Sequence, residues 1–367
     1  MTVPAAKIYD CRLSEIDDVL GASKREMRYP LNPTTRTMFE FLLEKVRSDR
    51  SFLLPVNLDS FVRLFCNLSL FAFAFYLIRN GLGLLAFFLV GVVQYHFLVM
   101  IHEAVHMGLF HPKRLNEFAG EWIGALLLVN FRSQRRWHLY HHKSYGLGED
   151  PDRPAYTFHE NNGRTPVIFL FRLSTQIFAG PLTRLFSELK ANKPRPVVAV
   201  LKGDQSGGSG ERLFYILRVI CCQLVLSWIY FTFLSPVSYF LFWILPLPLV
   251  AGNLSGLRTF LEHSDLGREN PKAEEQFLTV RTTFDDSEGL VGLGSRTICW
   301  IIAPFNFNYH HEHHILPFVP YTHLPKLHKI LSAHSHYERF PAVHSSSYLR
   351  TLAHALQGER APVNVQN

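Results

Sequence analysis

Apolar residues are gathered into four segments along the chain, separated by stretches rich in polar and charged residues. A helix needs about 20 residues to cross the hydrocarbon core of a bilayer, and the four segments come close to that length: 61–78, 82–101, 213–234 and 237–257. A helix in the core of a soluble protein keeps a polar face, whereas residues 237–250 show almost none. The pattern therefore predicts an all-α membrane protein with four transmembrane helices.

The connections between these segments predict how the helices pair. Only a few residues around Gly81 separate the first two segments, and Ser235 and Pro236 separate the last two, which indicates two helical hairpins. Loops on the cytoplasmic side of a membrane carry an excess of Lys and Arg. The first turn carries Arg79 alone and the second carries no basic residue. We therefore expect both turns to face outward and the remaining segments to form a cytosolic helical cap.

This topology divides the chain into three parts. We expect a cytosolic N-terminal segment at 1–57, an integral membrane domain at 58–330 and a cytosolic C-terminal tail at 331–367. Two stretches between the hairpins, Glu117–Asn130 and Pro166–Phe186, are apolar but interrupted by polar residues. Such stretches are typical of interfacial or re-entrant helices rather than of full spans.

The composition supports a membrane protein and argues against a nucleic-acid-binding one. The formal net charge is +7 and 48% of the residues are hydrophobic, yet the mean hydropathy is only +0.06. A basic balance can indicate nucleic acid, but that requires a soluble polar face, which the apolar segments leave little room for. We expect no nucleic-acid partner and attribute the charge to cytosolic loops near anionic lipid.

Histidines supply the candidate chemistry. The chain has 19 histidines, of which ten fall in the windows 102–111, 138–142 and 310–314. Residues three and four apart share one face of a helix, so each window can direct two or three imidazoles at one point. The spacing applies to His102 and His106, to His138, His141 and His142, and to His310, His313 and His314. We predict that these windows bind metal.

The number of imidazoles bears on which metal is bound. Eight exceed what one tetrahedral zinc ion uses, so they divide naturally between two ions. Iron is the redox-active choice for attacking C–H bonds, although imidazole also suits copper and zinc, and spacing alone leaves these open. The segment His102–His106 also matches the H-E-x-x-H pattern of zinc proteases, with Glu103 as general base. That alternative leaves the clustered histidines of the other two windows unexplained.

Three motifs resemble the histidine boxes of the membrane fatty acid desaturase superfamily. They are HEAVH at 102–106, RRWHLYHH at 135–142 and NYHHEHH at 308–314, and the similarity covers roughly residues 95–330. In this family a further histidine precedes the third box, and His263 in RTFLEHSD resembles it. The resemblance implies that two iron ions are held by His102, His106, His138, His141, His142, His263, His310, His313 and His314.

Residues beside these ligands have expected supporting roles. Ligating imidazoles usually donate their second N–H to an oxygen, so we expect such contacts from the neighbouring carboxylates Glu103, Asp150, Glu262 and Glu312. We expect His111 and His311 to lie beside the ligands, and we leave the role of His96 open. The remaining histidines lie in polar stretches and are expected at the surface: His159, His323, His328, His334, His336, His344 and His354.

The resemblance implies oxidation of a lipid with dioxygen. The first box is HxxxH, the third begins with His310, and no cytochrome b5 motif is fused, so the chain departs from the acyl-CoA and front-end branches. These features favour an acyl-lipid desaturase but leave open a sphingolipid hydroxylase and a carotenoid ketolase or hydroxylase. The active site is expected to face the cytosol, in a bacterial inner membrane or the endoplasmic reticulum.

Electrons are expected to come from a separate carrier. A nicotinamide site would show a strand, then G-x-G-x-x-G, then a helix, and the nearest match, Gly208–Leu213, lacks the third glycine. We therefore expect a ferredoxin or a cytochrome b5-type donor with its reductase. A basic cluster beside the second box suits an acidic carrier or a lipid headgroup: Arg132, Arg135, Arg136 and Lys143.

Overall fold

The structure is a computed structural model. The structure describes residues 33–145, 150–153, 209–263, 280–282, 290–334 and 343–345. The predicted interfacial helix at Pro166–Phe186 lies outside these residues.

Within the described residues, four helical segments have the length and composition to cross a membrane, as the sequence predicted. They are Ser51–Arg79, Gly83–Val105, Leu213–Phe233 and Pro236–His263. Large apolar side chains on them lie open at the surface: Leu84 is 74% exposed, Phe65 71% and Leu224 65%. Such exposure would be costly in water and fits a surface that faces lipid.

The second and fourth segments are longer than the sequence predicted. Helix α4 (Gly83–Val105) continues beyond residue 101, and the fourth segment continues beyond residue 257 to His263. These last turns carry histidine and glutamate, which lower the hydropathy and hide the helix from an apolar pattern. The first histidine box therefore begins on α4 itself, and His263 ends the fourth segment.

Helix α4 is the centre of the membrane part. It packs against α3 (Asn57–Arg79) and against the fourth segment, and its inner residues are almost completely buried. Its closest contact is at Gly91, where an added Cβ would lie 2.3 Å from Cβ of Val250. Nearby, Gln94 donates a hydrogen bond of 2.7 Å to the carbonyl of Trp243. Only glycine at residue 91 allows the two backbones to approach so closely.

The fourth segment is not a regular α-helix. It runs through α11 (Pro236–Tyr239), two π-helical stretches at Phe240–Ile244 and Leu247–Gly252, and α12 (Asn253–His263). Pro246 and Pro248 lack the N–H that an α-helix needs, and the wider π turns accommodate them within a continuous helical path.

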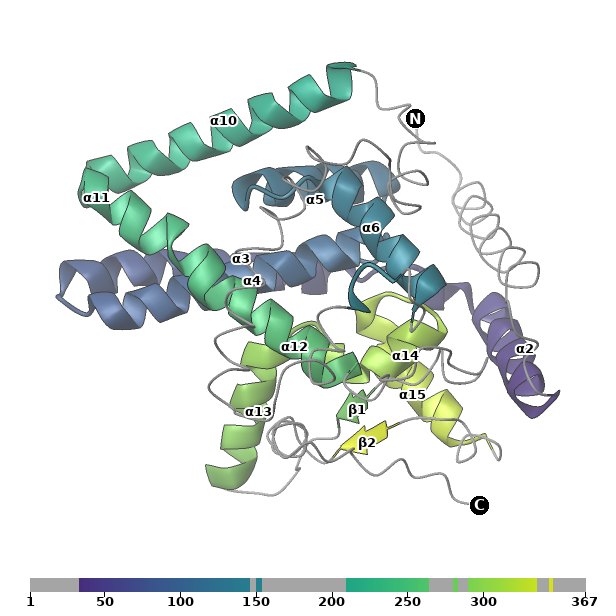
Figure 1. Ribbon diagram of the computed structural model, residues 1–367. Coiled ribbons are helices and arrows are strands. Elements are labelled where there is room, and N and C mark those ends of the chain that lie inside the picture. Colours follow the sequence, from purple (N-terminus) through teal and green to yellow (C-terminus); the bar gives the residue numbers. More distant parts are fainter. Residues whose placement is uncertain are drawn as a thin grey trace.

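Helix α10 (Ser209–Phe233) leans over α5 (Lys113–Leu126), as Figure 1 shows. Gln223 of α10 donates hydrogen bonds to the carbonyls of Ala125 and Leu126, at 3.3 and 3.0 Å. These carbonyls belong to the last turn of α5, where the regular bonds of the helix run out; that of Ala125 also accepts from the N–H of Leu128 at 3.3 Å. A side chain from a candidate span thus completes the C-terminus of α5, which overlaps the interfacial helix predicted at Glu117–Asn130.

The remaining elements gather at one end of the candidate spans (Figure 1). The helices among them are α2 (Pro33–Ser48), η1 (Arg50–Leu53), α6 (Phe131–Ser144), α13 (Leu290–Ile302), η6 (Phe307–Tyr309), α14 (His310–Ile315), η7 (Tyr321–His323) and α15 (Leu324–Ser332). Two long-range contacts tie this end together. Asn57 exchanges two hydrogen bonds with the backbone of His111, and Lys326 pairs with Asp49 at 2.8 Å. The hydrogen bond from Lys326 lowers the pKa of Asp49 to about 2.

One pair of short strands departs from the all-α prediction. Strand β1 (Val280–Thr282) pairs in parallel with β2 (Val343–Ser345), with Val280 opposite Val343. Three residues are too few to produce a recognisable alternation of apolar and polar positions, so the sequence pattern missed them. Strand β2 lies within the segment predicted as a C-terminal tail.

Candidate metal centre

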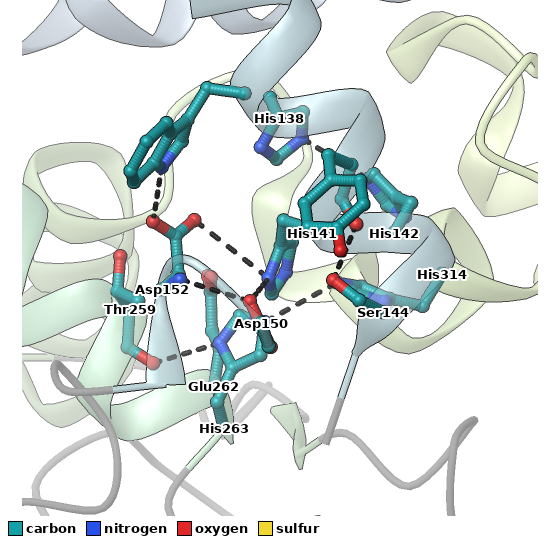
Figure 2. A network of polar contacts seen from close by, with 12 residues as sticks. His138, His141, His142, Ser144, Asp150, Asp152, Thr259, Glu262, His263 and His314 are labelled. Atoms are coloured by element: carbon teal, nitrogen blue, oxygen red, sulfur yellow. Dashed lines mark hydrogen bonds and ion pairs between the residues drawn. The ribbon is translucent and has the colours of Figure 1, made fainter. Parts of the chain in front are cut away.

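Three helices bring the histidine boxes together. His102 lies in the last turn of α4 and His106 caps its end, while α6 and α14 carry the second and third boxes. Asn130 caps the start of α6 by accepting a hydrogen bond from the N–H of Ser133 at 3.0 Å, as N-cap residues do. Figure 2 shows the imidazoles of α6 beside His263 and His314.

The turns that enter and leave these helices are sharp. Asn116 fixes the turn after the first box: its amide nitrogen donates to the carbonyl of Ala104 at 2.8 Å, and its oxygen accepts from the N–H groups of Leu109 and Phe110. Before the third box, Phe305 and Asn306 have left-handed backbone angles, with φ of 61° and 57°. This conformation costs roughly 1–2 kcal/mol per residue outside glycine, and burial of Phe305 at 1% exposure holds it in place.

The nine predicted histidines fall into compact groups. In the larger group the ligand atoms all lie within 4.8 Å of one another, and the members are His102, His106, His138, His142 and His313. Two smaller groups, defined by the same distance, share His263: one adds His141 and His314, and the other adds Glu262 and His310. The structure therefore brings every predicted ligand to one place.

Ring nitrogens face each other across these groups. Nε2 of His142 lies 3.1 Å from Nε2 of His138 and 3.2 Å from that of His313. Nε2 of His263 lies 3.3 Å from the same atom of His310 and of His314. Such contacts crowd several lone pairs into a small volume, which is the arrangement that a bound cation relieves.

In three histidines the contact of Nδ1 shows that Nε2 is the nitrogen without a proton. Nδ1 of His141 lies 2.8 Å from Asp150 Oδ1, and Nδ1 of His263 lies 2.8 Å from the carbonyl of Thr259. Nδ1 of His102 lies 3.2 Å from Glu103 Oε1. Because these oxygens only accept, Nδ1 carries the proton and Nε2 keeps a lone pair directed inward. The donor set therefore fits two transition-metal ions.

Burial favours the neutral imidazole at most of the predicted ligands, and His141 is the exception. Burial lowers the pKa of His106, His138, His142, His310 and His314 well below the usual 6.5. Burial likewise lowers the pKa of His313, to about 3. For His141, burial also acts to lower the pKa, but the charge and hydrogen bond of Asp150 outweigh it and raise the pKa. Neutral imidazole is the form that binds metal.

All four predicted carboxylates are buried next to the boxes. Glu103 accepts from the backbone N–H of Tyr321 as well as facing His102, and Asp150 faces His141. Glu262 Oε2 lies 3.6 Å from Nδ1 of His310. Glu312 differs, because its Oε1 lies 2.7 Å from Nδ1 of His328. Three carboxylates thus face predicted ligands, and the fourth faces another histidine.

That contact corrects the prediction that His328 lies at the surface. Its side chain is only 15% exposed, because the amphipathic helix α15 buries Leu324, Leu327 and Leu331 and carries His328 inward with them. His323 and His334 are also partly buried: His323 donates to the carbonyl of Leu54 at 2.9 Å, and His334 lies 4.8 Å from the ring of Phe41. The side chains of His159, His336, His344 and His354 lie outside the described residues.

The histidines whose roles were open also have positions. His311 is completely buried, but neither it nor His111 belongs to the groups formed by the described residues. His96 lies inside α4, where Nδ1 is 3.0 Å from Asn67 Oδ1 and the ring is 4.6 Å from that of Trp300. His96 therefore joins α3, α4 and α13.

The sequence did not predict a role for Arg258, whose buried guanidinium lies beside Glu262 and the ring of Phe307. The spacing of Arg258 and Glu262 by four residues could have indicated an ion pair on one helix face. Part of the predicted basic cluster is already paired within the chain: Arg132 contacts Glu121 at 2.9 Å, and Arg135 contacts Glu117 at 3.6 Å.

Comparison with known families agrees with this geometry. Residues 80–346 match the family model described as fatty acid desaturase, which covers most of the chain and all three boxes. No curated protein sequence matches the chain significantly.

Proposed function

Because the chain belongs to the fatty acid desaturase family, we propose that it is a membrane enzyme that introduces a carbon–carbon double bond into a fatty acyl chain with dioxygen. The observation that carries the proposal is the convergence of nine imidazoles, seven buried and two partly buried, in groups that fit two metal ions. The same convergence argues against the zinc-protease alternative, since His313 of the third box completes the group that contains the first box.

The two ions are iron in this proposal. One is held by the larger group, and the other by His141, His263, His310 and His314. When bound, iron supplies the activation of dioxygen that oxidation of an unactivated C–H bond requires. Copper and zinc stay possible on donor type alone, so the metal content has to be measured.

The protein orients and shields these ligands. Glu103 and Asp150 hold the rings of His102 and His141 through their outer nitrogens. Glu262 Oε2 lies 3.6 Å from the outer nitrogen of His310. Aromatic rings exclude water from the inner side: Phe307 lies 4.6 Å from His102, and Tyr145 lies 4.7 Å from His314. An apolar substrate is consistent with this lining.

Desaturation also fixes what the partners must supply. A methylene pair and dioxygen, together with two electrons and two protons, give the alkene and two waters. The electrons come from a ferredoxin or cytochrome b5-type carrier in this proposal. This carrier docks on the cytosolic cap of the enzyme. The membrane domain spans residues 58–330 and is flanked by the segments 1–57 and 331–367. It lies in a bacterial inner membrane or the endoplasmic reticulum.

Expression in a host that lacks such enzymes tests the reaction. Lipids and pigments are profiled by mass spectrometry, and the expected product is a fatty acyl chain that has lost two hydrogens. An added oxygen on a sphingolipid or a carotenoid would instead support a hydroxylase or ketolase of the same family.

Purified protein tests the metal. We expect close to two irons per chain, and loss of both iron and product in His141→Ala and His313→Ala. His334→Ala, which removes a partly buried histidine packed on Phe41, is the matched control. A zinc-only preparation that retains activity would contradict the proposal.

A further inference from the structure

Arg258 is a buried cation in a candidate membrane span. It lies in α12, one helical turn before Glu262, and is 9% exposed. An arginine stays protonated in proteins, and charged residues inside membranes are costly and usually paired or functional. Its neighbours therefore indicate why it is there.

One neighbour is the ring of Phe307. The guanidinium carbon of Arg258 lies 4.1 Å from the centroid of this ring, a favourable cation–π distance. The same ring lies 4.6 Å from His102 and 5.7 Å from His310. Phe307 is thus in contact with both a buried cation and the histidine groups.

The other neighbour is Glu262. Nε of Arg258 lies 3.4 Å from Glu262 Oε2, and the same oxygen lies 3.6 Å from Nδ1 of His310. Both oxygens of Glu262 are buried and accept no hydrogen bond from the described residues. A buried carboxylate needs a charged or donating partner, and Arg258 supplies a positive charge 3.4 Å from the same oxygen that faces His310.

We propose that Arg258 is a positioning residue for the metal ion bound by His141, His263, His310 and His314, an inference that rests on the proposed function. Its ion pair holds the carboxylate of Glu262 opposite Nδ1 of His310, and its stacking fixes Phe307. Nε2 of His310 is thereby directed at the position shared with His263, 3.3 Å away.

His310 differs from His141 and His263, two other ligands of this ion, in what orients it. His141 faces Asp150, which also accepts the N–H of Asp152 at 2.9 Å, and His263 donates to the carbonyl of Thr259 within its own helix. The carboxylate that faces His310 depends instead on a cation one turn away. Loss of that cation should therefore lower the affinity for one metal ion more than for the other.

Metal-binding measurements on purified apoprotein test this asymmetry. Fe²⁺ is added without oxygen and counted by elemental analysis, and Co²⁺ is titrated by its visible absorption. In the unchanged chain we expect two ions. In Arg258→Gln we expect the ion bound by His141, His263, His310 and His314 to bind about 10–100-fold more weakly, which is typical when the partner of a ligating histidine is lost. The affinity of the ion bound by the larger group should be nearly unaffected. Arg258→Lys should restore part of the loss, because it keeps the charge but not the planar stacking.

Arg63 provides a matched control. It lies in α3, pairs with Asp59 four residues earlier at 2.6 Å, and stacks on Phe305 at 5.1 Å, so it has the same kinds of contact with residues that are not predicted ligands. Arg63→Gln should lower the melting temperature but keep two ions of unchanged affinity. If Arg258→Gln does not fold, Glu262→Gln tests the same contact and should also lower the affinity for the ion of the His310 group alone.

The outcomes separate the two proposals. If a folded Arg258→Gln or Glu262→Gln variant bound both ions equally weakly, or both with unchanged affinity, the role of Arg258 would be overturned and the proposed function would stay intact. An unchanged chain that binds no pair of ions would overturn both.

Discussion

At the scale of single residues, the contact between Glu312 and His328 carries a prediction. Glu312 is completely buried, and its Oε1 lies 2.7 Å from His328 Nδ1. A hydrogen bond to a charged group contributes about 1.5–3 kcal/mol, so His328→Leu should destabilise the protein by that order. Thermal unfolding in detergent measures the change.

The control for this variant is Lys329→Ala, which changes an exposed residue on the same helix. A double-mutant cycle with Glu312→Gln should give a coupling energy of at least about 1 kcal/mol, as expected for residues in contact. Additive effects of the two substitutions would show that the pair does not act as drawn.

At the scale of elements, two glycines in helices should respond oppositely to the same substitution. Glycine inside a helix is disfavoured relative to alanine by about 1 kcal/mol, and at Gly294 of α13 an added Cβ meets nothing within 4 Å. Gly294→Ala should therefore raise stability. Gly91→Ala should lower it by about 1–3 kcal/mol, because the new methyl overlaps Val250 of the fourth segment.

Melting temperatures of the two variants check this difference in sign. The combination of Gly91→Ala with Val250→Gly should recover part of the loss, since it removes the side-chain atoms of Val250 that the new methyl would overlap. Stabilisation by Gly91→Ala alone would mean that α4 and the fourth segment are not as close as described.

The elements also show what a sequence can predict and what it cannot. Apolar composition located all four candidate spans, and the spacing of His138, His141 and His142 located a helix face. The ends of the spans were wrong because Glu103 and His263 lower hydropathy without ending a helix, while tertiary contacts continue it. The contact of Glu312 with His328 and the stacking of Arg258 on Phe307 join segments far apart in sequence, and no local pattern encodes such pairings.

At the scale of the whole molecule, the proposed topology makes a labelling prediction. With the five native cysteines replaced by serine, a cysteine at Asn80 or Ser235, both exposed between candidate spans, should react with a membrane-impermeant maleimide from outside the cell. A cysteine at Gln134, exposed on α6 beside the second box, should react only after permeabilisation. Labelling of Gln134→Cys in intact cells would place the histidine boxes on the opposite side.

The parallel pairing of β1 with β2 has a consequence for the order in which the chain is completed. Strand β1 contacts α12, η6 and α14, which surround the histidine groups, but its partner lies near the end of the chain. During synthesis from the N-terminus, the backbone of β1 therefore cannot pair until Val343–Ser345 has been made. A chain that ends before residue 343 would therefore hold β1, and the elements around the histidine groups that β1 contacts, without the strand that pairs with it.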